Sequence, residues 1–114
     1  PDGYASAAAA LERVDAGAAR TAFDAGMKRW PANLLLAVGA GNAAYAAKDL
    51  QGAAAAYRLA TERHPESADA WNNYAQALAD LGRREEARTA AQRAVKIGGP
   101  RAATYQDTLR SIAP

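Results

Sequence analysis

The chain has no cysteine and only one histidine, His64. The lack of cysteine excludes disulfides and thiolate chemistry, and leaves the redox compartment undetermined. His64 has no second histidine or cysteine at metal-ligand spacing, which excludes the usual metal-site patterns. Thr61 lies one turn before it, but no carboxylate is placed to orient the pair for nucleophilic catalysis. The sequence therefore predicts no metal, no cofactor and no catalytic residue, so these 114 residues are not expected to form an enzyme.

Aromatic and β-branched residues are also scarce. Half of the residues are apolar but only 7% are aromatic, and alanine supplies most of the apolar total. A core made of alanine buries little area per side chain. Alanine is, however, the best helix former and lets two helices approach closely. The composition therefore predicts helices and not a sheet.

Neither a concentrated charge nor a long apolar run is present. The net charge is +2, and basic residues are scattered among acidic ones, as in "RREEAR" at 83–88. This mixing argues against nucleic-acid binding, which usually needs a stripe of basic residues. No run reaches the roughly 18–20 apolar residues of a membrane span, so direct membrane insertion is not expected. The chain begins at Pro1 without an initiator methionine, as expected for a fragment of a longer protein.

One short stretch suggests a cofactor. Residues 39–44 read Gly-Ala-Gly-Asn-Ala-Ala after a run of leucines, which satisfies G-x-G-x-x-A. That pattern is typical of the glycine turn that binds a dinucleotide pyrophosphate. The motif also requires a strand before it and a second parallel strand after it, and no strand pattern follows.

An internal repeat explains these glycines differently. The prolines Pro31, Pro65 and Pro100 recur at an interval of about 34 residues, which is typical of a helical repeat. Three further columns keep the same register: Ala19, Ala53 and Ala87; Phe23, Tyr57 and Ala91; Gly26, Ala60 and Ala94. Gly41 occupies the position in the second unit that Ala75 occupies in the third. We therefore expect Gly41 at a point where two helices press together. Two glycines within one helix also predict that the first helix of the second unit is either a soft spot or a place where a ligand backbone comes close.

Each unit reads as two antiparallel helices. In the third unit, helices are predicted over 70–81 and 85–97, with Gly82 ending the first in the left-handed conformation. Polar residues precede the helices at the expected cap positions, namely Asn33, Ser67, Asp15 and Asp49. After Pro100, the apolar residues Ala102, Tyr105, Leu109 and Ile112 follow helical spacing, which predicts a closing helix.

The columns resemble those of the tetratricopeptide repeat (TPR) family. The resemblance is carried by Trp71, Tyr74, Ala75, Leu78, Gly82, Ala87, Ala91, Ala94 and a closing proline, and it covers about 4–100. It implies an all-α fold: a right-handed superhelix of three helix-turn-helix units plus a C-terminal capping helix. The single domain, 1–114, divides into repeats of about 1–31, 32–65 and 66–100 and a capping helix over 101–113.

A TPR fold implies a concave groove lined by the first helix of each repeat. The candidate ligand-binding residues are those turned away from the Trp71 stripe: Asn42, Tyr45, Asn72, Asn73, Gln76 and Asp80. By resemblance to peptide-binding TPR domains, Asn42 and Asn73 would hold a ligand backbone. Lysines of the subclass that clamps a terminal carboxylate are replaced by Val38 and Asn72. The alternative is that these amides only solvate a helix surface. Trp30 and Tyr4 are expected to pack and not to contact a ligand.

Three functions remain open on the sequence alone. The first is a protein-interaction module that binds a protein or an extended peptide in the groove. The second is a structural tail that forms a homo-oligomer through uncovered ends, such as 4–11. The third follows from a resemblance of 29–53, 71–83 and 94–100 to the TPR tails of bacterial C39-type papain-like peptidases, often exported lipoproteins. It would make the chain a non-catalytic accessory domain, periplasmic if that resemblance holds and otherwise of undetermined compartment.

Overall fold

The computed structural model describes residues 16–30 and 33–112, without the side chains of 16–20 and 24. Within these ranges the chain forms helices and no strand. The helices are α2 (Ala16–Arg29), α3 (Leu34–Ala46), α4 (Leu50–Arg63), α5 (Ala68–Asp80), α6 (Arg84–Ile97) and α7 (Ala102–Ile112). The all-α prediction is confirmed.

Three of the four polar residues predicted to cap helices do so. Asn33, Asp49 and Ser67 each accept a hydrogen bond from the backbone N–H three residues ahead, at 2.9, 2.9 and 3.2 Å. Gly82 ends α5 with a φ of 81°, in the left-handed region where glycine is favoured. The fourth predicted cap, Asp15, lies outside the described residues. The starts of α3, α4 and α5 thus follow from local side-chain chemistry.

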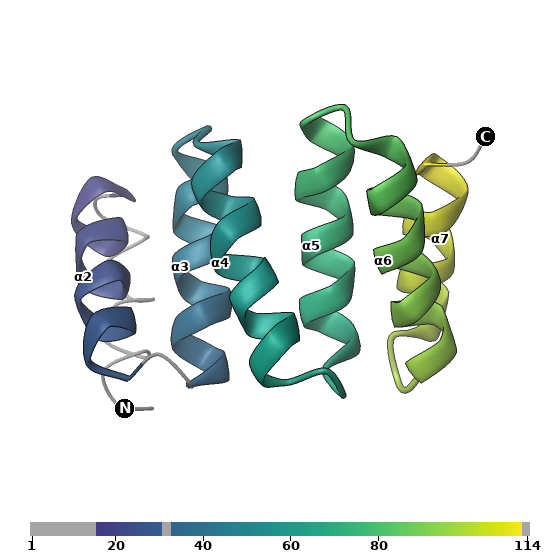
Figure 1. Cartoon of the computed structure of the whole chain (residues 1–114), viewed down its shortest axis with the longest axis horizontal. Coiled ribbons are helices and arrows are strands. Elements are labelled where there is room, and N and C mark those ends of the chain that lie inside the picture. Colours follow the sequence, from purple (N-terminus) through teal and green to yellow (C-terminus); the bar gives the residue numbers. More distant parts are fainter. Residues whose placement is uncertain (1–15, 31–32, 113–114) are drawn as a thin grey trace.

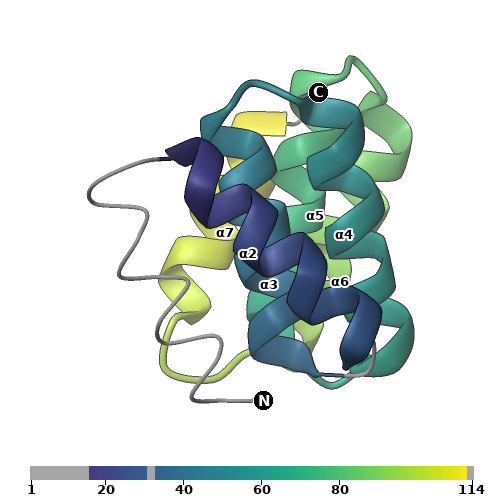
Figure 2. The same ribbon diagram turned by 90° about the vertical axis from the view of Figure 1, so that its left-hand side faces the viewer.

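The helices stack as a linear array. Figure 1 shows them in chain order along the long axis, from α2 at one end to α7 at the other. Each helix packs on the next, and α5 also packs directly on α7. Seen along the array, α3 and α7 lie on one side and α4 and α6 on the other (Figure 2). This arrangement is an all-α TPR-type superhelix.

The core follows the repeat columns. Phe23 and Tyr57, which occupy the same column of successive units, are 2% and 3% exposed. In the third unit this column holds a buried alanine, Ala91, and the other columns are filled by buried alanines that include Ala53, Ala60, Ala87 and Ala94. Trp30 packs against the cluster around Phe23, as expected, whereas Tyr4 lies outside the described residues. Alanine thus works here by allowing helices close together around a few large side chains.

The two glycines of the G-x-G motif lie within one continuous helix, α3. A Cβ atom added at Gly39 would lie 2.2 Å from Cε1 of Phe23, and one added at Gly41 would lie 2.2 Å from Cε1 of Tyr57. Glycine is therefore required because the rings of α2 and α4 lie against the α3 backbone. The prediction of a tight helix contact at Gly41 is confirmed, but the space is filled by an aromatic ring and not open to a ligand.

The closing helix α7 covers the last hairpin. Tyr105, Thr108 and Ile112 are buried, and Leu109 is half-buried. Ile112 packs with Leu78 and alanines of α5 and α6, while Tyr105 packs with Ala68 and Ala94. The apolar stripe read from the sequence is therefore the face that α7 turns toward α5 and α6.

Candidate functional site

A cleft between α3 and α5 brings together most of the predicted groove residues. It has a volume of about 210 Å³ and is lined by Asn42, Tyr45, Ala46, Tyr57, Asn73 and Gln76. We call it the α3–α5 cleft. Asn42 and Tyr45 lie one turn apart on α3, and Asn73 and Gln76 lie one turn apart on α5. Residues one turn apart share a helix face, so each helix presents two polar side chains to the cleft.

Tyr57 links the core to this cleft. Its hydroxyl donates a hydrogen bond to Oδ1 of Asn42 at 2.6 Å. A buried tyrosine needs a partner for its hydroxyl, and Gly41 lets the ring come close enough to reach one. The bond engages the amide oxygen of Asn42. The NH2 group of the same amide can then donate hydrogen bonds to other partners. The Asn42 amide is thereby held in one orientation.

Tyr45 and Asp80 form the edge of the cleft. The Tyr45 hydroxyl donates a hydrogen bond to the Asp80 carboxylate, which joins the end of α3 to the end of α5. This bond, followed by burial and by the negative charge of Asp80, raises the pKa of Tyr45. Asp80 itself lines a neighbouring hollow of about 280 Å³ with Ala79, Arg84, Ser111 and Ile112. Asp80 is therefore connected to the α3–α5 cleft through Tyr45.

Asn72 does not line the cleft. Its side chain is only 6% exposed, and its Oδ1 has no hydrogen-bond partner among the described residues. Successive residues of a helix differ by about 100°, so the Asn72 side chain is turned away from that of Asn73, toward the buried side of α5. The sequence-based assignment of Asn72 to the accessible groove is therefore corrected: its side chain belongs to the packed interior between helices.

A second tyrosine–aspartate bond fastens the other end of α5. The Tyr105 hydroxyl donates to Oδ1 of Asp69 at 2.6 Å, and Arg101 lies 3.5 Å from the other carboxylate oxygen. Burial, then the bond to Asp69, raises the pKa of Tyr105 to about 12. Helix α5 is thus bonded to α3 near its end and to α7 near its start.

Sequence reasoning missed two of the lining residues, Ala46 and Tyr57. Tyr57 shares a repeat column with Phe23, and its ring is buried. The signal available in the sequence was the hydroxyl, because this column holds a phenylalanine, Phe23, one repeat earlier. A tyrosine at a core position needs a polar neighbour, and Asn42 is the neighbour that it contacts.

The remaining residues singled out from the sequence give no site. His64 lies at the end of α4, with its Nδ1 3.4 Å from Oε1 of Glu66. The part of the chain that the structure describes contains no cluster of metal-ligating side chains and no helix long and apolar enough to span a bilayer. Residues 4–11, on which the prediction of end-to-end association depends, lie outside the described ranges.

Comparison with known families agrees with this architecture. The sequence model described as "Tetratricopeptide repeat" matches residues 4–65 and 40–103, which together span most of the chain. The chain belongs to the tetratricopeptide repeat family. No curated protein sequence matches it significantly. The resemblance to C39-type peptidase tails is not supported by these comparisons.

Two solved TPR structures share the fold. The first TPR of Spaghetti (RPAP3), bound to the HSP90 peptide SRMEEVD, superposes with a TM-score of 0.87 at 20% identity, covering 96% of this chain and 87% of that chain. The Sgt2 TPR domain from Aspergillus fumigatus gives a TM-score of 0.86 at 23% identity, with coverage of 97% and 75%. At such identities these matches establish the TPR fold of this chain.

Proposed function

We propose that this TPR domain is a protein-interaction module whose α3–α5 cleft binds an extended peptide segment through its backbone. The observation that carries the proposal is the convergence of three side-chain amides, those of Asn42, Asn73 and Gln76, on one cleft. Each amide has a donor and an acceptor group, which matches the N–H and C=O groups of an extended chain. The proposal assigns no catalytic role to any residue.

The prearranged amide of Asn42 supports this proposal. Tyr57 holds its oxygen at 2.6 Å, so the NH2 group is directed before any ligand binds. A side chain that is already ordered loses less conformational entropy on binding. The amides of Asn73 and Gln76 have no hydrogen-bond partner among the described residues, and remain available to a ligand.

The cleft favours a neutral backbone over a terminal carboxylate. None of the six described residues that line it is charged, and Asp80 adds a negative charge at its edge. The Spaghetti TPR in the solved complex holds a peptide ending in Glu-Glu-Val-Asp. Here Val38, at a position where the carboxylate-clamp subclass has lysine, is half-buried beside the cluster of Ala37, Ala60 and Ala70.

We expect Asn42→Ala and Asn73→Ala to weaken binding of a peptide selected from a peptide array by about threefold to tenfold each, the usual effect of losing one hydrogen bond. Fluorescence anisotropy with the labelled peptide gives the dissociation constants. Gln51→Ala on the exposed surface of α4 is the matched control. Undiminished binding by both asparagine variants would remove the α3–α5 cleft as the binding site.

The Tyr57→Phe variant tests the orientation of the Asn42 amide separately from its contact with the peptide. The variant keeps the ring that packs on Gly41 but removes the hydroxyl that holds Asn42. If the held amide matters, Tyr57→Phe weakens binding, but it has little further effect in the Asn42→Ala background, since the two changes act through one group. Additive effects of the two changes would contradict this coupling.

A further inference from the structure

A second surface, separate from the α3–α5 cleft, lies along α6. One hollow of about 520 Å³ is lined by Pro65, Glu66, Arg93, Lys96 and Ile97. An adjoining hollow of about 410 Å³ is lined by Trp71, Thr89, Gln92, Arg93 and Lys96. Because Arg93 and Lys96 line both, we treat the two hollows as one surface, the α6 cleft. It shares no lining residue with the α3–α5 cleft.

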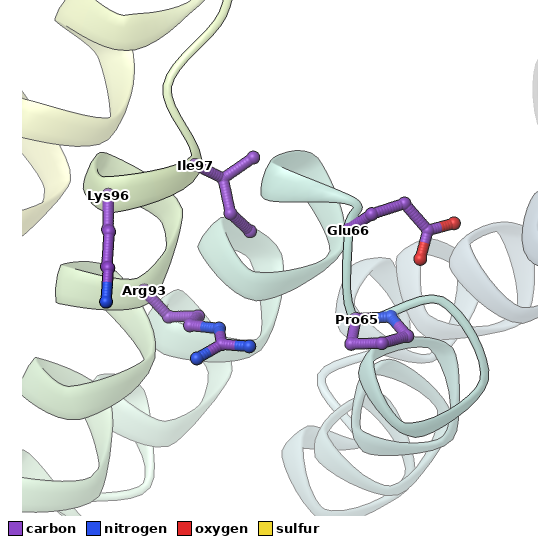
Figure 3. A pocket seen from close by; sticks show the side chains of 5 residues that line it. All are labelled: Pro65, Glu66, Arg93, Lys96 and Ile97. Carbon is purple, nitrogen blue, oxygen red and sulfur yellow. The ribbon is translucent and has the colours of Figure 1, made fainter.

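The α6 cleft carries two cations without carboxylate partners. No acidic group of the described residues forms an ion pair with Arg93 or Lys96, whereas Arg58, Arg101 and Arg110 are each paired. Among the described residues that line the cleft, Glu66 carries a carboxylate, and its Oε1 lies 3.4 Å from Nδ1 of His64. Figure 3 shows the Glu66 side chain directed away from Arg93. A ligand in the cleft therefore meets a net positive potential.

The floor between these cations is apolar. Ile97 is 38% exposed at the end of α6, and Figure 3 shows it facing the gap between α6 and the turn with Pro65. Trp71 adds an aromatic face. Its Nε1–H donates a hydrogen bond to the carbonyl oxygen of Pro65 at 2.9 Å, which fixes the orientation of the ring. The guanidinium of Arg93 lies 5.6 Å from the centre of the Trp71 ring. Ile97 is thus an exposed aliphatic side chain beside the Trp71 ring. An apolar group of a ligand would be buried against these two side chains.

We propose that the α6 cleft binds an acidic peptide segment in which carboxylates flank a bulky aliphatic side chain. The carboxylates pair with Arg93 and Lys96, and the aliphatic side chain packs on Ile97 and Pro65. Charge complementarity selects this partner, because among the described residues Arg93 and Lys96 have no carboxylate partner and the Glu66 carboxylate is directed away from Arg93. Two cations on one helix are too few to follow a nucleic-acid backbone, and the apolar floor matches a side chain better than a phosphate.

The test uses three labelled nonapeptides: GSEELEEGS, its leucine-to-alanine counterpart GSEEAEEGS, and the charge-reversed GSKKLKKGS. Binding is measured by fluorescence anisotropy, and the site is mapped by two-dimensional NMR of the ¹⁵N-labelled protein. We expect GSEELEEGS to shift the Trp71 indole signal and the amides of Lys96 and Ile97. The alanine peptide should bind more weakly, and the lysine peptide should not bind.

Variants locate the contacts. Arg93→Ala with Lys96→Ala should weaken GSEELEEGS binding roughly fivefold or more, the sum of two exposed charge pairs. Arg83→Ala removes a cation at the opposite end of α6 and should change little, and Asn42→Ala tests whether the α3–α5 cleft is involved. Far-UV circular dichroism checks that each variant is folded.

Four outcomes would overturn the proposal. The first is binding that Arg93→Ala with Lys96→Ala leaves unchanged. The second is equal binding of the leucine and alanine peptides, which would leave only non-specific charge attraction. The third is a short oligothymidylate that shifts the same signals at lower concentration, which would identify a nucleic-acid surface instead. Loss of GSEELEEGS binding in Asn42→Ala would likewise assign the peptide to the other cleft.

Discussion

At the scale of single residues, two glycines of α3 each contact an aromatic ring of a neighbouring helix. Gly39 accommodates Phe23, and Gly41 accommodates Tyr57, each with its backbone against the aromatic ring. A glycine inside a helix costs about 1 kcal/mol relative to alanine. That cost is offset here because the rings fill the space that a methyl group would occupy, and because Tyr57 then reaches Asn42.

We expect Gly41→Ala to destabilise the domain by about 1–3 kcal/mol, in spite of the better helix propensity of alanine, because the added methyl overlaps the Tyr57 ring. Urea unfolding monitored by circular dichroism measures the change in the free energy of unfolding. In a Tyr57→Leu background the penalty should shrink, since the overlapping ring is gone. A Gly41→Ala protein more stable than the wild type would contradict the overlap.

At the scale of helices, two equivalent positions of successive units differ in their capping. Asp49 caps α4 with backbone angles of −90° and 81°, whereas Arg83, at the equivalent position of the next unit, begins α6 at −87° and 68° without a side-chain cap bond. The backbone at Arg83 is therefore already shaped for a capping side chain that the sequence does not supply.

Arg83→Asn should supply the missing cap. We expect the variant to raise the free energy of unfolding by about 0.5–1 kcal/mol, because asparagine is among the best N-cap residues and adds no negative charge near Glu85 and Glu86. Asp49→Ala is the reciprocal variant and should lower stability by a similar amount. Thermal unfolding compares the two, and a destabilised Arg83→Asn protein would show that arginine contributes something other than a cap.

At the scale of the whole molecule, α5 is joined to both of its neighbours in the same layer. Tyr45 and Asp80 connect it to α3, and Asp69 and Tyr105 connect it to the closing helix. Repeat arrays depend on contacts between neighbouring units and on a terminal unit that covers the last apolar face. The Tyr105 bond therefore fixes the helix that closes the array.

The raised pKa of Tyr105, about 12, makes this closure sensitive to alkali. The folded state holds the neutral phenol more firmly than the unfolded chain, whose tyrosine pKa is about 10. This contribution to stability is complete below pH of about 10 and is lost as the pH rises toward about 12. We expect Tyr105→Phe to lower stability at neutral pH and to flatten the alkaline decline, measured as unfolding free energy between these two pH values. An unchanged alkaline slope would refute the linkage.

The sequence by itself determined the fold and most of the positions where helices begin and end. Columns that recur at the repeat interval set the number and order of the described helices, and Asn33, Asp49, Ser67 and Gly82 set where helices begin or end. These features are local or periodic, so they can be read along the chain without knowledge of distant contacts. Four of the six groove candidates, Asn42, Tyr45, Asn73 and Gln76, also line one cleft.

The tertiary structure alone decided which helix faces are accessible to a ligand and which are buried. Asn72 and Asn73 are neighbours in sequence, but one is buried and the other lines the α3–α5 cleft. The Tyr57–Asn42 bond and the absence of carboxylate partners for Arg93 and Lys96 among the described residues likewise depend on how helices pack against one another. The rotation of each helix about its axis is set by the fit of side chains across the interface, which a sequence pattern locates only to within about one residue, or about 100°.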